Sequence, residues 1–351
     1  METRGAAPPA AAAPAPHEWG GTLAKLVKRE NLSEDEAAAA FEVIIRGDAT
    51  PSQIAGFLVA LRMKGETSDE ITGFARTARA MATPIEVDGD LLDTCGTGGD
   101  GLATFNISTL AAIVAAACGA RVAKHGNRAA SSLCGSADVL EALGVKIDLT
   151  PDGVARCIDQ AGIGFLFAPV FHPSFRFAGV PRRELGLRTV FNVLGPLCNP
   201  AGARYQALGV ADAAMAGKMA EVLVRLGVER AIVFHAADGM DELSVASPSF
   251  VIEIDGQRKE YELDPAELGL QRAPLESMRG GGPEDNARLA REVLGGAEGP
   301  RRDVVLLNSA AALQAAGIAT GWKDGLGHAA EAIDSGRAGE VLERWARISQ
   351  E

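Results

Sequence analysis

Apolar residues in the first quarter of the chain recur at the three- and four-residue spacing of an α-helix. Hydroxyl residues divide this pattern between residues 18 and 82. Ser33 precedes Glu-Asp-Glu, Thr50 precedes a proline, and Ser68 precedes Asp-Glu. Such sequences are typical of the first turn of a helix, where a hydroxyl oxygen accepts from free N–H groups and acidic charges face the positive end of the helix dipole. The pattern predicts a small helical domain over residues 18–88.

Beyond residue 90 the pattern changes to short apolar runs that alternate with longer amphipathic segments, many of which end at a glycine. Alternating strands and helices are typical of a mostly parallel sheet with helices on both faces. The predicted fold class is therefore α/β, with a small all-helical domain in front. The predicted strands include residues 121–124, 163–168, 231–235 and 304–308, and the predicted helices include residues 107–118, 135–144 and 150–162.

Ligands of open α/β sheets bind beyond the carboxyl ends of the strands. Polar residues and glycines are concentrated in the segments that would follow those ends, which are residues 96–101, 124–132, 169–173 and 236–244. We expect these segments to meet in one crevice.

The first of these segments is rich in glycine and reads Asp-Thr-Cys-Gly-Thr-Gly-Gly-Asp-Gly over residues 93–101. Because glycine lacks a Cβ atom, this backbone can adopt positive φ and approach a ligand closely. Its N–H groups, with those that open the next helix, form a concave site that suits a phosphate. Two alternatives remain: a tight turn without a ligand, and a dinucleotide site, because Gly96, Gly98 and Gly101 also satisfy Gly-x-Gly-x-x-Gly.

Two cations, an imidazole, an amide and two hydroxyls are gathered in residues 124–132. Residues of these types are common on solvated loops. Lys124 and Arg128 would also supply the local positive charge with which an acidic protein holds a phosphate. The position of the segment after a strand favours the second interpretation.

Adjacent carboxylates, Asp241 and Glu242, follow the strand predicted at residues 231–235. Neighbouring acids on a loop usually have no function, but magnesium is commonly held by one or two carboxylates together with phosphate oxygens and water. The pair is a candidate magnesium site if the glycine-rich segment binds phosphates. A further stretch, residues 171–184, mixes aromatics with arginines, and there an arginine would fix the carboxylate of an aromatic acid or pair with Glu184 on the surface.

The composition of the chain excludes some classes of binding partner and some cellular locations. The 351 residues are 47% hydrophobic and 23% charged, as in ordinary globular proteins, and the formal net charge of −12 argues against nucleic acid as a partner. No apolar run reaches the roughly 18 residues of a membrane span. The five cysteines lack metal-ligand spacing, and residues 1–17 lack the apolar stretch of a secretory signal. We therefore expect a cytoplasmic protein, with residues 1–17 as a disordered Ala/Pro tail.

Six stretches of the chain, taken in order, resemble the anthranilate phosphoribosyltransferases. The resemblance runs from about residue 20 to residue 345. Each motif alone has limited specificity, whereas six in register are highly specific. They are residues 93–100 (Asp-x-x-Gly-Thr-Gly-Gly-Asp), 105–109 (Phe-Asn-Ile-Ser-Thr), 124–128 (Lys-His-Gly-Asn-Arg), 135–144 (Gly-Ser-Ala-Asp-Val-Leu-Glu-Ala-Leu-Gly), 188–200 (Arg-Thr-x-Phe-Asn-x-Leu-Gly-Pro-Leu-x-Asn-Pro) and 238–242 (Asp-Gly-x-Asp-Glu).

This resemblance implies a helical domain and a larger α/β domain of the nucleoside phosphorylase type. Residues 18–88, joined by about 178–203, would form the first, and residues 89–177 and 204–351 the second. It implies a homodimer formed through the helical parts. It also implies transfer of the phosphoribosyl group from phosphoribosyl pyrophosphate to the amine of anthranilate, in tryptophan biosynthesis, with two Mg²⁺ ions per subunit.

Roles of individual residues follow from the same resemblance. Gly96, Asn127 and Arg182 would contact anthranilate. Ser108, Asp241 and Glu242 would bind magnesium. No side chain is implied as acid or base, because an aromatic amine is already unprotonated at neutral pH and the reaction depends on positioning and charge stabilisation. The residues implied to bind phosphoribosyl pyrophosphate are Gly96, Gly99, Asp100, Thr104, Asn106, Ile107, Ser108, Thr109, Lys124, His125, Gly126, Asn127, Arg128, Ala129, Ala130, Ser131, Ser132 and Ser136.

Three other functions share parts of this pattern. A pyrimidine nucleoside phosphorylase would have the same architecture, but the two adjacent carboxylates and the block ending at Pro200 disfavour it. A nicotinamide-dependent oxidoreductase would place an acidic residue about 20 residues beyond the glycine-rich segment. This chain has Lys124 there. A non-enzymatic regulator with this fold would not need metal-binding carboxylates.

Overall fold

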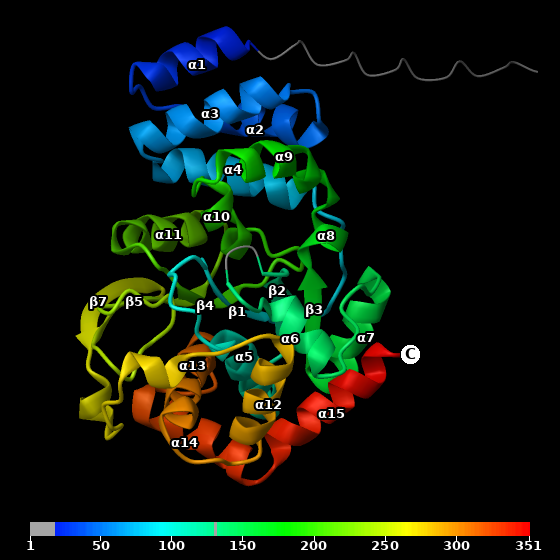
Figure 1. Ribbon diagram of the computed structural model, residues 1–351, viewed down its shortest axis with the longest axis vertical. Helices are drawn as coiled ribbons and strands as arrows, with labels where there is room; N and C mark the ends of the chain where they lie inside the picture. The colour runs from blue at the N-terminus through cyan, green and yellow to red at the C-terminus, as the bar shows by residue number, and fades with distance from the viewer. Residues whose placement is uncertain (1–17, 130–131) are drawn as a thin grey trace, which may run out of the picture.

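The computed structural model describes residues 18–129 and 132–351. The tail predicted at residues 1–17 lies outside the described residues, as do Ala130 and Ser131 of the predicted ligand set. A layer of helices stands at one end of the molecule, above a larger α/β part (Figure 1). This layer contains α1 (Trp19–Val27), α2 (Glu34–Arg46), α3 (Pro51–Lys64) and α4 (Ser68–Ala80).

Capping boxes start three helices of this layer. The hydroxyls of Ser33, Thr50 and Thr67 each accept a hydrogen bond from the backbone N–H three residues later, where a Glu or Gln side chain accepts from the cap in return. The predicted starts at Ser33 and Thr50 are confirmed, and the third cap lies one residue before Ser68. The helical layer therefore follows from signals that are local in the sequence.

In the described chain a seven-stranded sheet forms the centre of the α/β part, in the order β3-β2-β1-β4-β5-β6-β7. The strands from β1 to β5 are parallel, and β6 and β7 form an antiparallel hairpin at one edge. The predicted mostly parallel sheet is thus confirmed. The strands are β1 (Leu92–Gly96), β2 (Val122–Gly126), β3 (Ile163–Phe167), β4 (Tyr205–Gly209), β5 (Arg230–Ala236), β6 (Ser249–Asp255) and β7 (Gln257–Leu263).

Helices cover both faces of this sheet. Ile232 of β5 packs in the core beneath α5 and α13, whereas its neighbour Val233 packs in the core that α11 shares with the helical layer. Within the described residues, no helix combines the length and the apolar character needed to cross a membrane. The helices of this part are α5 (Ile107–Ala117), α6 (Ser136–Ala142), α7 (Pro151–Ala161), α11 (Ala213–Arg225), α12 (Pro283–Leu294), α13 (Pro300–Ala315), α14 (Trp322–Asp334) and α15 (Arg337–Ser349).

The prediction of a strand at residues 304–308 is wrong, because these residues lie in the middle of α13. A short apolar run does not distinguish a buried strand from a buried helix. The helix α13 is packed between α5, α14 and the sheet, so it is apolar on nearly every side. Its Asn308 holds the connection between β5 and β6, because its side-chain oxygen accepts from the N–H of Leu243 at 3.0 Å and its side-chain NH2 donates to the carbonyl of Leu243 at 2.9 Å.

After β3 the chain returns to the helical layer through α8 (Ala168–Phe171), α9 (Gly179–Leu185) and α10 (Phe191–Leu194) (Figure 1). There α9 packs against α3, and α10 packs against α4. The ring of Phe191 lies 5.3 Å from that of Phe41 of α2. The segment between α9 and α10 is therefore anchored in the helical layer.

Candidate active site

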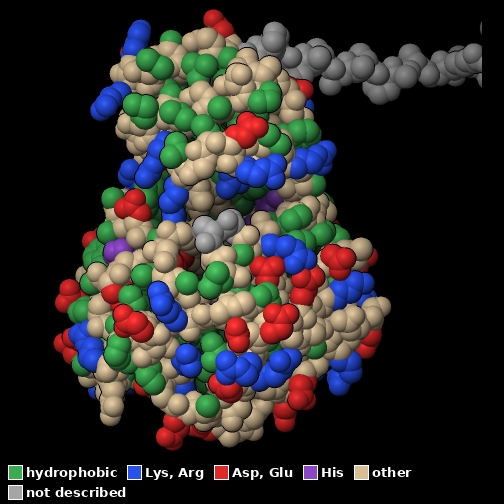
Figure 2. All heavy atoms as spheres, viewed as in Figure 1, with side chains coloured by type: hydrophobic (Ala, Val, Ile, Leu, Met, Phe, Trp, Pro, Cys, Tyr) green, Lys and Arg blue, Asp and Glu red, His purple; other side chains and the backbone are tan. Residues whose placement is uncertain are grey.

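A cleft of about 310 Å³ opens where β1, β2 and β5 end, beneath the helical layer. In the space-filling view it is the hollow between the two parts of the molecule (Figure 2). Residues 96–100, residues 124–129 and the pair Asp241 and Glu242 line it, so these predicted segments do meet. The segment at residues 169–173 stays outside the lining. Its His172 instead packs behind His125, with ring centroids 5.1 Å apart.

One wall of the cleft is the glycine loop, residues 96–101. Gly98, Gly99 and Gly101 have φ of 70°, 76° and 75°, which is the left-handed region that favours glycine. Thr97 fixes the loop to β4, because its N–H donates to the carbonyl of Gly209 at 2.9 Å. The N–H groups of residues 99–101 donate no hydrogen bond to any other described residue and remain free for an anion.

Close approach of a carboxylate, not backbone strain, requires glycine at position 96. A Cβ atom on Gly96 would lie 2.8 Å from Cγ of Asp241. The N–H of Gly98 donates to Oδ2 of Asp241 at 2.6 Å. In the first turn of α5, the N–H of Ser108 donates to Oε1 of Glu242 at 3.1 Å. Both acidic side chains are thus held against the glycine loop and the start of a helix.

Burial and like charges make these carboxylates resist ionisation. Asp241 and Glu242 are each 8% exposed. Burial, and then the charge of Asp100, raise the pKa of Asp241 to about 7. Burial, and then the charge of Asp241, raise the pKa of Glu242 to about 8. Oδ2 of Asp100 is also buried without a hydrogen-bond partner among the described residues. A bound cation would relieve this cluster of acidic groups.

Lys124, which lines the cleft, is 1% exposed and has protein partners. Its Nζ donates to the carbonyl of Thr94 at 2.5 Å and to Oγ of Ser108 at 3.3 Å. Asp93 lies fully buried nearby and accepts from the amide of Asn199 at 2.8 Å. Burial lowers the pKa of Lys124, and the charge of Asp93 opposes that shift. The ammonium therefore belongs to an internal network that also positions Ser108.

Arg128 is engaged at the outer rim of the cleft. Its guanidinium pairs with Asp138 and Glu141 and lies 5.7 Å from the ring centroid of Phe167. Asp138 also accepts from the N–H of Ala129 at 2.9 Å. These contacts hold the segment after β2 against α6, and they already compensate the charge of Arg128.

Asn286 of α12 supports a residue of the site, Asn106, and sequence reasoning misses it. Its amide donates to Oδ1 of Asn106 at 2.9 Å, and the amide of Asn106 donates to the carbonyl of Cys134 at 3.1 Å. Asn286 is 2% exposed, although it stands among the polar residues that open a helix. Nothing in the sequence separates it from a solvent-facing residue of such a turn.

Polar residues also approach from the helical side. Asn192 of α10 lines the cleft. Arg188, between α9 and α10, lies against the glycine loop, because a Cβ atom on Gly99 would be 2.7 Å from its Cζ. Arg182 of α9 lies outside the lining, with Cζ 4.8 Å from the ring centroid of Phe191, and burial lowers its pKa.

Comparison with known proteins agrees with this architecture. Residues 21–82 match the helical bundle domain of a glycosyl transferase family, and residues 88–339 match its a/b domain. Anthranilate phosphoribosyltransferase 2 of Streptomyces coelicolor is 60% identical over 320 residues, which cover 91% of this chain and 96% of the relative. The chain belongs to the anthranilate phosphoribosyltransferase family.

Solved structures of anthranilate phosphoribosyltransferases share the fold. The crystal structure of the enzyme from Thermus thermophilus superposes with a TM-score of 0.89 at 48% identity, covering 94% of this chain and 99% of that one. The enzyme from Saccharomyces cerevisiae in complex with PRPP and Mg has a TM-score of 0.86 at 29% identity and covers 95% and 98%. The resemblance and the fold class expected from the sequence are thereby confirmed.

The anthranilate phosphoribosyltransferase motifs bring most of the predicted residues to the cleft. Ile107 is completely buried instead, and Arg182 lies on α9 outside the lining. Cys134 and Asn192 line the cleft without having been singled out, although Asn192 stands in the motif at residues 188–200. The predicted residues that line it are Gly96, Gly99, Asp100, Thr104, Asn106, Ser108, Thr109, Lys124, His125, Gly126, Asn127, Arg128, Ala129, Ser132, Ser136, Asp241 and Glu242.

Proposed function

We propose that this protein transfers the phosphoribosyl group of phosphoribosyl pyrophosphate to the amine of anthranilate and releases pyrophosphate. The observation that carries the proposal is the contact between the glycine loop and the buried carboxylates. The backbone N of Gly98, in the loop that suits an anion, lies 2.6 Å from Oδ2 of Asp241, an oxygen that suits a cation. A diphosphate together with a divalent cation satisfies both groups at once.

Magnesium fits the donor set of this cleft. Asp241 and Glu242 provide two hard carboxylate oxygens, and Oδ2 of Asp100 is a further oxygen without a protein partner. No cluster of three or more His, Cys, Asp or Glu side chains in residues 18–129 and 132–351 is arranged to hold a metal ion. Ser108, Asp241 and Glu242, with phosphate oxygens and water, would hold two Mg²⁺ ions per subunit. Bound magnesium would stabilise the charge that develops on the leaving pyrophosphate.

Anthranilate is assigned to the helical side of the cleft. The guanidinium of Arg182 has no hydrogen bond or ion pair with any other described residue, which leaves it free for a carboxylate. Nδ1 of His125 contacts the carbonyl of Gly195 at 3.0 Å, and its Nε2 has no partner among the described residues. Burial lowers the pKa of His125 to about 4. The imidazole is therefore neutral, and its Nε2 atom is buried, so His125 adds no charge to the part of the cleft that Gly96 and Asn127 line.

Positioning is the main contribution of the protein to this reaction. Correct alignment of two reactants supplies roughly 7–11 kcal/mol of barrier reduction in favourable cases. The proposal predicts that anthranilate fluorescence falls when the protein is mixed with Mg²⁺, phosphoribosyl pyrophosphate and anthranilate. A mixture without magnesium is the control. Stable fluorescence, with phosphorolysis of thymidine instead, would show that the protein is a nucleoside phosphorylase.

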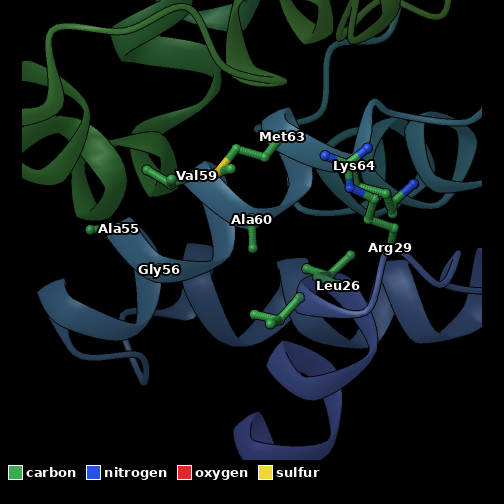
Figure 3. Close-up of a pocket in the computed structure, with 9 residues that line it drawn as sticks. Leu26, Arg29, Ala55, Gly56, Val59, Ala60, Met63 and Lys64 are labelled. Carbon is green, nitrogen blue, oxygen red and sulfur yellow. The ribbon is translucent and has the colours of Figure 1, made fainter.

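We also propose a homodimer formed through the helical layer. Val27 of α1 is 74% exposed and Met63 of α3 is 70% exposed. Both line an apolar groove of about 480 Å³ between these helices, together with Leu26 and Val59 (Figure 3). Large apolar side chains gathered on one surface are typical of a protein interface.

A charge in this groove should separate the subunits. The variant Met63→Glu is expected to sediment as a monomer at a concentration where the unchanged protein sediments as a dimer, because a carboxylate cannot be buried without a partner. Val224→Glu is the matched control, since Val224 is 53% exposed on α11, away from the groove. Dimers of Met63→Glu, or monomers of the unchanged protein, would contradict the proposed interface.

The remaining assignments are also proposals. We assign residues 18–88 and 178–203 to one helical domain, and the packing of α9 on α3 supports this assignment. The described parts of residues 89–177 and 204–351 form the α/β domain. A cytoplasmic location is supported by the cysteines, which are all unpaired thiols in the structure.

A further inference from the structure

Arg188 is a cation that lies against the glycine loop without a counter-ion among the described residues. It is half-buried, and it makes no hydrogen bond or ion pair with any other residue that the structure describes. Arg128, which lines the cleft, has two acidic partners. A guanidinium that is partly removed from water and left unpaired costs free energy unless a ligand compensates it.

The position of its guanidinium indicates the ligand. A Cβ atom on Gly99 would lie 2.7 Å from Cζ and 3.3 Å from Nη2 of Arg188, so the guanidinium lies directly over the glycine loop. The free N–H groups of residues 99–101 belong to the same loop. Donors from two elements that are far apart in the sequence therefore converge on one place.

The helical layer holds Arg188 there. Val190 and Phe191, which follow it, are 1% and 5% exposed and belong to the core of that layer. Thr189 donates its N–H to Oδ1 of Asn192 at 2.9 Å, which closes the turn that carries the arginine. Arg188 thus reaches the glycine loop from an anchored segment.

We propose that Arg188 binds the diphosphate of the phosphoribosyl substrate from the helical side, opposite the carboxylates Asp241 and Glu242. This inference rests on the proposed function. The planar fork of a guanidinium donates to two phosphate oxygens at once, while the N–H groups of the glycine loop donate to the other side of the same anion. Arg182 differs, because its guanidinium stacks on Phe191 instead of lying over the glycine loop, and it suits the second substrate.

Kinetics of three arginine variants test this assignment. Arg188→Ala is expected to raise the KM for phosphoribosyl pyrophosphate and the Kd for inorganic pyrophosphate with Mg²⁺ by roughly tenfold to a hundredfold, as for a lost hydrogen bond to a charged group. The KM for anthranilate should change less than twofold. Arg182→Ala should show the reverse pattern. Arg183→Ala, at an exposed position of α9, is the matched control with no change in any of these values.

Arg188→Lys should recover part of the pyrophosphate affinity, because lysine keeps the charge but loses the fork. If Arg188→Ala lowers the melting temperature, Arg188→Lys is the variant with which pyrophosphate binding is tested. Pyrophosphate binding by both variants at the level of the unchanged protein, or a change confined to anthranilate, would overturn the inference. The binding measurement uses inorganic pyrophosphate with Mg²⁺ and no anthranilate, so it tests Arg188 even if transfer to anthranilate is not observed. Absence of that transfer would contradict only the proposed function.

Discussion

Replacing Asp241 with Asn and Glu242 with Gln together should reduce turnover by roughly a thousandfold or more while leaving the protein at least as stable as before. The loss is expected because charge stabilisation at the leaving group contributes several kcal/mol to catalysis. Stability should not fall, since Asn and Gln keep the oxygens that accept from Gly98 and Ser108. The two amides would also remove buried like charges. Turnover at saturating Mg²⁺ and the thermal midpoint without Mg²⁺ measure the two effects.

A neutral change elsewhere separates this effect from the loss of net negative charge. Glu262→Gln is suitable, because Glu262 is exposed on the edge strand β7. That variant should keep full turnover. Unchanged turnover in the double variant would remove the metal assignment, and a large fall of its thermal midpoint would show that the carboxylates stabilise the fold instead.

Signals that act over a few residues are the part of this structure that the sequence predicts well. Ser33 and Thr50 mark helix starts because a capping box involves only positions three residues apart. The glycine loop is recognised in the same way, since Gly98, Gly99 and Gly101 all need positive φ within one turn. The alternation of such short segments then predicts the correct sheet type.

Packing from distant segments is the part that could not be predicted. Residues 304–308 are apolar because α13 is surrounded, and local periodicity cannot reveal what surrounds a segment. Asn286 acts on Asn106 across 180 positions in the chain, so no spacing rule connects the two. Arg188 meets Gly99 only because the chain returns to the helical layer between β3 and β4.

Charge compensation is equally hidden from the sequence. In the sequence, Lys124 and Arg128 belong to one motif and look like two free cations. The prediction of a phosphate site rested partly on that interpretation. In the structure, Arg128 pairs with Glu141, and Lys124 lies buried against Thr94 and Ser108. Whether a cation in a motif faces a ligand or a protein carboxylate depends on partners that only the fold brings near.

Lys124→Met should therefore destabilise the protein, in addition to impairing its activity. Removing one member of a buried charge network typically costs roughly 3–5 kcal/mol, because the remaining charge is left without compensation. Here Asp93 would keep its buried carboxylate, and the carbonyl of Thr94 would lose its donor. Urea unfolding at neutral pH measures the loss. Lys259→Met is the control, since Lys259 forms an exposed pair with Glu253 at 3.6 Å and should change stability by less than about 1 kcal/mol.

A second substitution shows whether the loss comes from the internal charge. Asp93→Asn added to Lys124→Met removes the uncompensated carboxylate, so the double variant should be more stable than Lys124→Met alone, although Asn199 then loses a charged acceptor. If Lys124 acted only as a ligand for substrate phosphate, Lys124→Met would unfold at the same urea concentration as the unchanged protein, and only its KM for phosphoribosyl pyrophosphate would rise. The coupling between the two positions therefore distinguishes a lysine that supports the site from within the protein from one that only binds substrate.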